Sequence, residues 1–355
     1  MRNVDFIIVG QGLAGTCLAW ELLALGASVV VIDREAAVTS SRIAAGLITP
    51  VTGLRLVKTW RWEALRAAAW DFYRRIENDL GCSLLRETSM VKVFASAQGQ
   101  DYFQKRMRDL QYAGLISETK ELPVGVSAPF GSCELWQGGQ LYVAEFLQRS
   151  RERFVHEGCY LAGDLAWPED LRGEGEVELP RWGLRASKLI FCQGINARSN
   201  PWFSPVEFNP ARGEMLVVRI PNWTEDRIVH GSVWIAPGPP PFYRVGATYD
   251  WSDLDAGPTP AGRQSLIESL DRLLHVPYEI VDHQSAVRPI LQHVHPVVGM
   301  HPRDSRLGYF NGLGSKGSLQ APFIARHFAS HLMMQTPLDP EVDLQVRTSW
   351  RPVPA

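Results

Sequence analysis

The stretch that decides the fold is Phe6-Ile7-Ile8-Val9-Gly10-Gln11-Gly12-Leu13-Ala14-Gly15, close to the N-terminus. Its first four residues are apolar and mostly β-branched, which is typical of a parallel strand buried on both faces. A G-x-G-x-x-G pattern follows at once, residues 14–25 predict a helix that ends at Gly26, and residues 28–32 predict a second buried strand. This β-α-β unit predicts an α/β fold with a dinucleotide site.

Each glycine of the motif has its own physical task. Gly10 permits a tight turn, Gly12 lets the backbone approach a pyrophosphate, and Gly15 allows the helix to pack closely on the strand. The helix N-terminus offers free N–H groups and a positive dipole end to the phosphates. Asp33, roughly 20 residues beyond the glycines, is placed to accept hydrogen bonds from an adenosine ribose. The predicted nucleotide-binding residues are Gly10, Gly12, Leu13, Ala14, Gly15, Asp33 and Arg34.

Length and composition favour a globular protein of two domains. The chain has 355 residues, of which 45% are hydrophobic and 21% charged. Lys and Arg number 36 against 38 acidic residues, so nucleic acid is not a favoured partner and would need a local basic patch. Five scattered cysteines without a C-x-x-C pair predict neither disulfides nor a metal site and favour a cytoplasmic location. Glu21 and several glycines interrupt the apolar N-terminal run, so we expect no transmembrane segment.

The rest of the chain predicts a mixture of helices and strands. Helical periodicity is found at residues 60–80, 100–113 and 142–154, and from about residue 322 to 334. Strands are expected at 90–95, 188–192, 214–220, 243–248 and 307–311. The strands around the Pro-rich turn at 237–241 favour an antiparallel sheet, which predicts a second domain of different architecture.

Two segments resemble those of a known family. Ser40-Ser41-Arg42-Ile43-Ala44-Ala45-Gly46-Leu47-Ile48-Thr49-Pro50 resembles a flavin-binding segment of the FAD-dependent D-amino-acid oxidase superfamily, above all of glycine oxidases. Asn311-Gly312-Leu313-Gly314-Ser315-Lys316-Gly317-Ser318-Leu319-Gln320-Ala321-Pro322 resembles the flavin-ring segment. It is closest to the Gly-Ser-Arg-Gly and Ala-Pro pattern in the oxidase domain of bifunctional bacterial enzymes that modify the tRNA wobble uridine. Lys316 replaces the arginine of that pattern, and we expect no attached methyltransferase domain, so both differences argue against a tRNA substrate.

Shorter matches follow in the same order as in the superfamily. They are Gln193-Gly194, Arg212-Gly213-Glu214, Gly246-Ala247-Thr248, Arg288-Pro289 and Pro296-Val297-Val298-Gly299. The resemblance implies FAD as the cofactor, with the flavin ring at a domain interface. The implied flavin-binding residues are Ser41, Arg42, Ala45, Gly46, Leu47, Gly194, Gly312, Gly314, Ser315, Lys316, Gly317 and Ser318.

The resemblance also implies a bipartite fold. A glutathione-reductase-like Rossmann FAD domain would be assembled from residues 1–80, 140–210 and 285–355. An inserted α+β substrate domain with an antiparallel sheet would comprise residues 81–139 and 211–284.

Two cations are the candidate catalytic residues. Arg288 would hold a substrate carboxylate, because a guanidinium fork matches a carboxylate and the superfamily places an arginine there; the alternative is a structural arginine. Lys316 would add a positive charge beside the reduced flavin or assist electron transfer to oxygen; the alternative is a surface lysine in a turn. One or two aromatic residues are expected to line the pocket, drawn from Trp234, Tyr243, Tyr249 and Trp251.

The expected function is FAD-dependent oxidation of the C–N bond of an amino acid or N-substituted glycine-like amine, by hydride transfer to the flavin. Molecular oxygen or another acceptor would take the electrons. One alternative is oxidation of the carboxymethylaminomethyl group of tRNA wobble uridine, and another is a flavin-binding protein without amine turnover. A tRNA would dock on the basic residues Arg55, Lys58, Arg61, Arg66, Arg74 and Arg75.

Overall fold

The predicted β-α-β unit forms the centre of the first large sheet. The computed structural model describes residues 1–166, 169–173, 175–255, 257–293 and 295–350. The unit consists of β1 (Arg2–Val9), α1 (Leu13–Ala24) and β2 (Val29–Asp33). Ile7 and Ile8 of β1 are fully buried, and each such side chain contributes about 1.5 to 3 kcal/mol to folding. The apolar run therefore specifies a strand that is covered on both faces.

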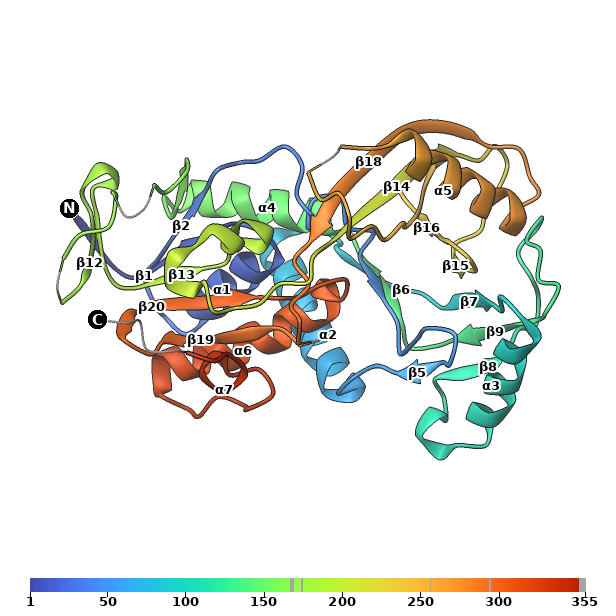
Figure 1. Cartoon of the computed structure of the whole chain (residues 1–355), viewed down its shortest axis with the longest axis horizontal. Coiled ribbons are helices and arrows are strands. Elements are labelled where there is room, and N and C mark those ends of the chain that lie inside the picture. The colour runs from blue at the N-terminus through green and yellow to red at the C-terminus, as the bar shows by residue number, and fades with distance from the viewer. Residues whose placement is uncertain (167–168, 174, 256, 294, 351–355) are drawn as a thin grey trace.

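The first large sheet combines strands from distant parts of the chain. Its order is β11-β2-β1-β13-β20-β19, with β12 paired to β13. The strands that join the unit are β11 (Tyr160–Ala162), β12 (Val177–Leu179), β13 (Leu184–Phe191), β19 (Val297–His301) and β20 (Asp304–Asn311). Pairing is parallel from β11 to β20 and antiparallel for β12 and β19. Figure 1 shows this sheet and its helices as the left-hand lobe.

Helices cover one face of this sheet. They are α1, α2 (Trp62–Leu80), α4 (Val143–His156) and α6 (Gly317–Met334). Their apolar side chains share one core cluster with Phe6, Ile8, Val29 and Val31 of the central strands. The opposite face packs against irregular segments, including three 3₁₀ segments at Pro180–Trp182, Gly194–Ser199 and Pro201–Phe203, and against the short α7 (Leu344–Arg347).

The C-terminal helix corrects one prediction. α6 begins at Gly317 and not near residue 322, so Pro322 lies inside the helix. A proline at this position leaves the carbonyl of Ser318 without its helical N–H donor. The hydroxyl of Tyr73 donates to that carbonyl at 2.8 Å and replaces the missing bond. Periodicity alone does not show a partner that comes from another helix.

The second large sheet forms the right-hand lobe of Figure 1, with the order β18-β14-β17-β16-β15-β7-β9-β8. Its strands are β7 (Met90–Val93), β8 (Ile116–Glu118), β9 (Ser132–Leu135), β14 (Ala211–Arg219), β15 (Ile228–His230), β16 (Trp234–Pro237), β17 (Phe242–Gly246) and β18 (Glu279–Arg288). The described pairs are antiparallel, as expected, except that β7 and β15 run parallel. Parallel pairing is possible here because β7 and β15 are far apart in the chain and are not joined by a hairpin, which would require antiparallel pairing.

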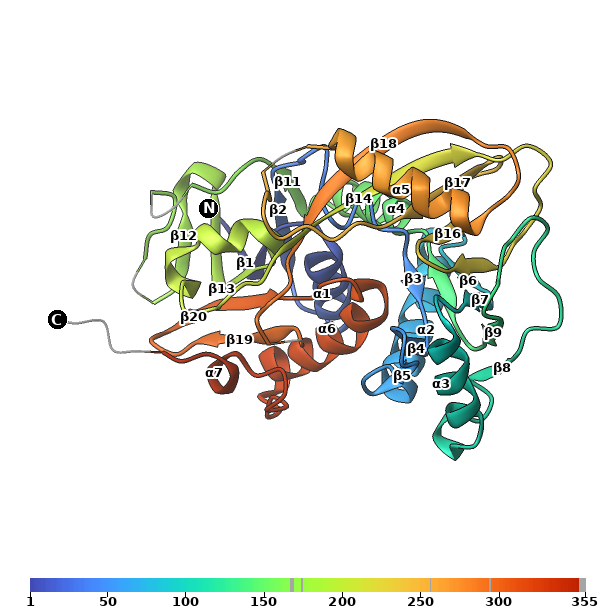
Figure 2. The ribbon, with the colours of Figure 1, turned by 45° about the vertical axis from the view of Figure 1, so that its right-hand side comes forward.

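Smaller elements complete this lobe. Helix α5 (Pro260–Leu273) packs on one face of the second sheet. The predicted helix at 100–113 is divided into α3 (Ala97–Met107) and a 3₁₀ turn at Leu110–Tyr112. Between the lobes lie the small sheet β3-β10-β6 and the hairpin β4-β5 (Figure 2). Their bounds are β3 (Leu47–Ile48), β4 (Val51–Thr52), β5 (Val57–Lys58), β6 (Leu85–Glu87) and β10 (Gly139–Leu141).

β18 continues to Arg288 and so crosses the expected domain boundary at residue 285. The exact domain limits stay a prediction.

Candidate functional site

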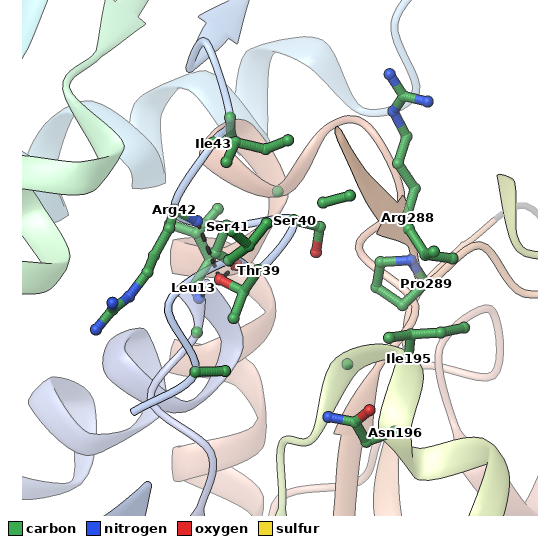
Figure 3. Close-up of a pocket in the computed structure, with 18 of the residues that line it drawn as sticks. Leu13, Thr39, Ser40, Ser41, Arg42, Ile43, Ile195, Asn196, Arg288 and Pro289 are labelled. Carbon is green, nitrogen blue, oxygen red and sulfur yellow. Dashed lines mark hydrogen bonds between the residues drawn. The ribbon is translucent and has the colours of Figure 1, made fainter. Parts of the chain in front are cut away.

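A cavity of about 1040 Å³ runs from the carboxyl ends of β1, β2 and β13 to the second sheet. Ligands of open α/β sheets bind at this edge, outside the carboxyl ends of the strands. Figure 3 shows residues 39–43 on one side of the cavity, and Ile195, Asn196, Arg288 and Pro289 on the other. Segments that are up to about 250 residues apart in the chain therefore line one cavity.

The glycine turn is as tightly packed as the motif predicts. Gly10 has a φ of +104°, and a Cβ atom there would lie 2.5 Å from the carbonyl oxygen of Cys192. A Cβ atom on Gly15 would lie 1.9 Å from the carbonyl oxygen of Gly10. Gly12 is the N-cap of α1 and lines the cavity, where a Cβ atom would lie 3.1 Å from the hydroxyl of Ser41. Two glycines thus permit backbone contacts, and the third leaves room for a ligand.

The start of α1 is suited to an anion. No side chain caps the helix and its first turn has no acidic residue. The backbone N–H of Leu13 makes only a long hydrogen bond, 3.3 Å, to Ser41 Oγ. Unpaired N–H groups and the helix dipole at such a terminus favour a phosphate. This end of the cavity fits the pyrophosphate of a dinucleotide.

Asp33 is held at the end of β2 by the backbone. Its carboxylate accepts hydrogen bonds from the N–H groups of Gln11 at 2.7 Å and Glu35 at 2.8 Å. A carboxylate has about four acceptor sites, so sites remain for the hydroxyls of a ribose. The guanidinium of the neighbouring Arg34 lies 2.6 Å from the side-chain amide of Asn196.

The segment that contains residues 41–47 is fixed by the small sheet and by the second large sheet. Gly46 has a φ of +76°, and a Cβ atom there would lie 1.8 Å from the carbonyl oxygen of Leu141 in β10. Arg244 of β17 donates a hydrogen bond of 2.8 Å to the carbonyl of Ala44. Leu141 belongs to the small sheet between the lobes and Arg244 to the second large sheet, so this segment is held from two sides at the cavity.

The C-terminal loop also reaches the cavity. Gly314 lines the wall, with Ser315, Gly317 and Ser318 beside it. Asn311 donates a 2.8 Å hydrogen bond to the carbonyl of Gly194, which connects two of the predicted segments.

Lys316 is the N-cap of α6, and its Nζ lies 3.4 Å from Thr59 Oγ1. Burial lowers the pKa of Lys316. Three predicted site residues, Gly15, Gly312 and Lys316, do not line the cavity, whereas the other predicted residues do.

Arg288 projects from the end of β18 into the cavity wall. Its Nη1 donates to the carbonyl of Thr248 at 3.2 Å, and its guanidinium lies 4.1 Å from the ring centre of Tyr249. Burial lowers the pKa of Arg288. Within the described ranges no acidic side chain pairs with it, whereas Arg212 on the adjacent strand pairs with Asp250 at 2.5 Å. A bound anion would therefore supply the acidic partner that Arg288 lacks among the described residues.

Two of the candidate aromatic residues line the cavity. Trp234 and Tyr249 form part of its wall. Tyr243 is a core residue whose hydroxyl donates to the carbonyl of Trp223 at 2.7 Å. Trp251 is exposed and stacks on Tyr249 with ring centres 5.9 Å apart.

Two further residues at the nucleotide end were not expected from the sequence. Arg151 of α4 lines the cavity and lies 3.5 Å from Asp33 and 3.2 Å from Glu35. Its Nε also donates to the buried side chain of Gln11, which is fixed in turn by the carbonyl of Leu147. Gln11 could have been found from the sequence, because it lies within the glycine motif. Arg151 has no local signal, because more than a hundred residues separate it from the motif.

Among the residues that the structure describes, no group of His, Cys, Asp and Glu side chains could hold a metal ion. In the same residues, no helix has the length and apolar character needed to cross a membrane.

Comparison with known proteins identifies the class. The model of the DAO family of FAD-dependent oxidoreductases matches residues 5–331. The chain belongs to this family, and its cofactor is FAD. The resemblance inferred from the sequence is thereby confirmed.

Two curated relatives are similar over parts of their length. The tRNA 5-methylaminomethyl-2-thiouridine biosynthesis bifunctional protein MnmC of Marinobacter nauticus is 31% identical over 170 residues, which cover 43% of this chain and 27% of that protein. The bifunctional protein ThiO/ThiG of a Nostoc species is 24% identical over 361 residues, covering 93% of this chain and 53% of that protein. The chain therefore matches about half or less of these relatives.

The fold is similar to solved structures over its full length. The glycine oxidase from Bacillus cereus superposes with a TM-score of 0.81 at 17% identity, and the match covers 99% of this chain and 100% of that one. At this identity the likeness concerns the fold alone. It confirms the predicted combination of an α/β part with a second sheet-containing part.

Proposed function

We propose that this oxidoreductase oxidises the C–N bond of an amine that bears a carboxylate, such as an amino acid or an N-substituted glycine. The observation that carries this proposal is Arg288, a half-buried guanidinium on the cavity wall without an acidic partner in the described chain. A guanidinium in this state favours a bidentate anion. The glycine oxidase activity named for the structural relative is consistent with such a substrate.

The residues of the cavity divide into two groups by what they would hold. The glycine turn, Asp33 and the start of α1 would bind the adenosine diphosphate part of FAD, and residues 41–47 and 312–318 would enclose the flavin ring. When bound, FAD supplies the acceptor for the hydride that leaves the carbon beside nitrogen. Arg288 would orient the carboxylate, so that this carbon faces the flavin in a defined position. Trp234 and Tyr249 would exclude water from the reacting carbon.

An anaerobic titration tests the proposal. The FAD-loaded protein is mixed with glycine, sarcosine, proline, D-amino acids and other N-substituted glycines, and the flavin band is recorded. We expect at least one carboxylate-bearing amine to bleach the band, and air to restore it if oxygen is the acceptor. Bleaching by none of these amines would leave a flavin-binding protein without amine turnover.

The ion pairs of the basic residues that were expected to dock a tRNA argue against the tRNA alternative. Most of its cations are paired within the chain: Lys58 with Glu63, Arg61 with Asp339 and Glu341, Arg66 with Glu87, Arg74 with Glu77, and Arg75 with Glu21. Paired cations attract phosphates less, because the acidic partner cancels their charge at short range. A salt-sensitive mobility shift with tRNA would contradict this inference. The cytoplasmic location and the use of oxygen stay predictions.

A further inference from the structure

The side chain of Arg288 lies beside a hollow made by small residues. In the pairing of β14 with β18, Ala211 is opposite Arg288 and Gly213 is opposite Ala286. Cross-strand partners, and residues two positions apart on one strand, share one face of a sheet. Figure 3 shows the side chain of Arg288 extended away from Pro289. Because Ala211, Gly213 and Ala286 have no atoms beyond Cβ, this face has room for a long side chain.

Tyr249 forms the other wall of the hollow. The backbones of Arg212 and Asp250 exchange two hydrogen bonds, of 2.8 and 2.9 Å, on the side of β14 that β18 does not occupy. This antiparallel pairing places Tyr249 opposite Gly213. The guanidinium of Arg288 crosses β14 to reach the ring, and its central carbon lies 4.1 Å from the ring centre.

The guanidinium occupies the space that a side chain at position 213 would need. A Cβ atom on Gly213 would lie 2.2 Å from both terminal nitrogens of Arg288 and 2.3 Å from the carbon between them. Non-bonded atoms are in contact at about 3.5 to 4.0 Å, so even the methyl of alanine would displace these nitrogens by about 1 Å. The atoms in the way are the end of a flexible side chain, so the backbone of β14 could stay in place.

The hollow fixes the guanidinium without neutralising its charge. A guanidinium has five N–H donors, and the acceptor among the described residues is the carbonyl of Thr248, 3.2 Å from Nη1. Thr248 is itself held on β14: its N–H donates to the carbonyl of Glu214 at 3.1 Å, and its hydroxyl accepts from the N–H of Glu214 at 2.9 Å. The position of the guanidinium is therefore set by shape and by one carbonyl, and donors remain for an anion.

We propose that Gly213 is a positioning residue for the substrate carboxylate: the missing side chain lets Arg288 lie against Tyr249 and so fixes the place where the acid group is held. The inference rests on the proposed function and deepens it. A bidentate pair requires both nitrogens of the fork at a defined place. A misplacement of about 1 Å can reduce a rate about 100-fold. Gly213 therefore contributes to the selection of acids, and it acts through Arg288.

Calorimetric titration of the FAD-loaded protein with unreactive acids tests this role. The probes are acetate, propionate and hexanoate, each compared with its neutral amide. We expect Gly213→Ala to lower the affinity for the acids about tenfold or more, because the fork is displaced. The affinity for the amides, the flavin content and the thermal unfolding temperature should stay close to those of the wild type.

A second background separates positioning from general damage. Lysine carries the same charge as arginine but has no fork, so it does not need the space over Gly213. Arg288→Lys should bind the acids more weakly than the wild type. Adding Gly213→Ala to Arg288→Lys should change the affinity less than about twofold, because the two residues act as a coupled pair.

Gly231→Ala is the matched control. Gly231 follows β15 in the same sheet, a Cβ atom there would lie 2.7 Å from a methyl carbon of Leu273, and the residue does not line the cavity. Its replacement should leave the affinity for the acids unchanged. If Gly213→Ala loses its flavin, Tyr249→Leu is the second variant, because it removes the opposite wall and should weaken acid binding about threefold or more.

Two kinds of result overturn the inference. Unchanged acid affinity in Gly213→Ala, or in Tyr249→Leu where that variant is needed, shows that the hollow does not position Arg288, and so does an equal loss in the Arg288→Lys background. The proposed function survives such a result. Acids that do not bind the wild type, or that bind Arg288→Leu equally well, also overturn the inference, and the amine screen then decides the proposed function separately.

Discussion

The two ends of the cavity differ in how their polar groups are satisfied. At the glycine end, formed by Gly10 and Asp33 with Gly15 packed behind the turn, the protein supplies many of the partners itself: the carboxylate of Asp33 accepts hydrogen bonds from two backbone N–H groups, and the two glycines lie against backbone carbonyls. At the arginine end, formed by Arg288, Tyr249 and Trp234, the guanidinium has one carbonyl and one ring as partners and no described acid. The backbone of the first end is therefore fixed by contacts within the protein, whereas the guanidinium of the second end lacks an anionic partner.

This difference predicts different consequences of mutation. A change at a glycine that lies against a backbone carbonyl, such as Gly10 or Gly15, disturbs backbone packing and should affect folding and cofactor binding together. A change at the arginine end removes a group that the fold does not require, and should affect the substrate alone. Four substitutions test the contrast, in order of decreasing effect.

Gly15→Ala should have the largest effect. The new methyl would lie 1.9 Å from the carbonyl oxygen of Gly10, so α1 must shift away from the turn. We expect the free energy of unfolding to fall by about 2 to 3 kcal/mol and the bound FAD to fall more than about tenfold. Thermal unfolding and the ratio of flavin to protein absorbance measure the two effects.

Two other glycines calibrate that result. Gly175→Ala places a methyl in open space and should change neither stability nor FAD content. Gly12→Ala puts a methyl 3.1 Å from the hydroxyl of Ser41, on the cavity side of the turn, and should weaken FAD binding with little loss of stability. Equal stability of Gly15→Ala and Gly175→Ala would refute the close-packing explanation.

Arg288→Leu should retain FAD and lose activity on carboxylate-bearing amines. A hydrogen bond to a charged group contributes about 1.5 to 3 kcal/mol, which corresponds to a fall in kcat/KM of about 10- to 150-fold. The control is Arg219→Leu, because Arg219 also lies in the second sheet but pairs with Glu279 on the surface. If Arg288→Leu oxidises the same amines as efficiently as the wild type, Arg288 is structural and the contrast between the two ends is wrong.

Lys92 of β7 is half-buried, and no described residue makes an ion pair or a hydrogen bond with its amine. Lys92→Met should therefore stabilise the protein, in a pH-dependent way. Below pH 8 Lys92 is charged in both states, so the wild type bears the full cost of burying the charge. From about pH 8 to 10.5 the folded state loses this proton while the unfolded state keeps it, so the wild type gains stability with pH. The advantage of Lys92→Met, about 1 to 2 kcal/mol at pH 7, should therefore shrink above pH 8.

Denaturant unfolding at several pH values measures this difference. Cys133 and His230, which lie opposite Lys92 on the neighbouring strands, stay neutral in the folded state between pH 7 and 10. The thiol of Cys133 ionises in the unfolded state over this interval, but it does so in both proteins, so its contribution cancels in the difference between them. A stability difference that does not change over this interval would show that Lys92 is not buried as a free charge.

Lys316→Met should have the smallest effect. The side chain lies near Thr59 and not on the cavity wall, and the glycines of the loop still supply backbone donors. FAD should remain bound, and the reduction potential should fall by about 20 mV, the equivalent of about 1 kcal/mol for two electrons. A redox titration beside stopped-flow reoxidation is the measurement, and agreement of both with the wild type would make Lys316 a turn residue.

The parts of the fold that depend on residues close together in the chain could be predicted from the sequence, and those that depend on distant residues could not. The first β-α-β unit was predicted correctly because its strand, turn and helix signals are contiguous in residues 6–33. The start of α6 was not, because the stability of a helix through Pro322 depends on the hydroxyl of Tyr73. The parallel pair of β7 and β15 was missed for a similar reason, since no turn sequence connects them.

The sequence by itself determined the family, the cofactor and the dinucleotide motif, because these depend on glycines, caps and apolar runs that act over a few residues. Only the tertiary structure decided which cations lack a partner. Arg212 and Arg288 look alike in the sequence, but Arg212 meets Asp250 and Arg288 meets none of the described acids. Lys92 likewise reads as a strand lysine until the register places it beyond Trp234. Charge pairing is a property of side chains that approach through space, and folding alone brings them together.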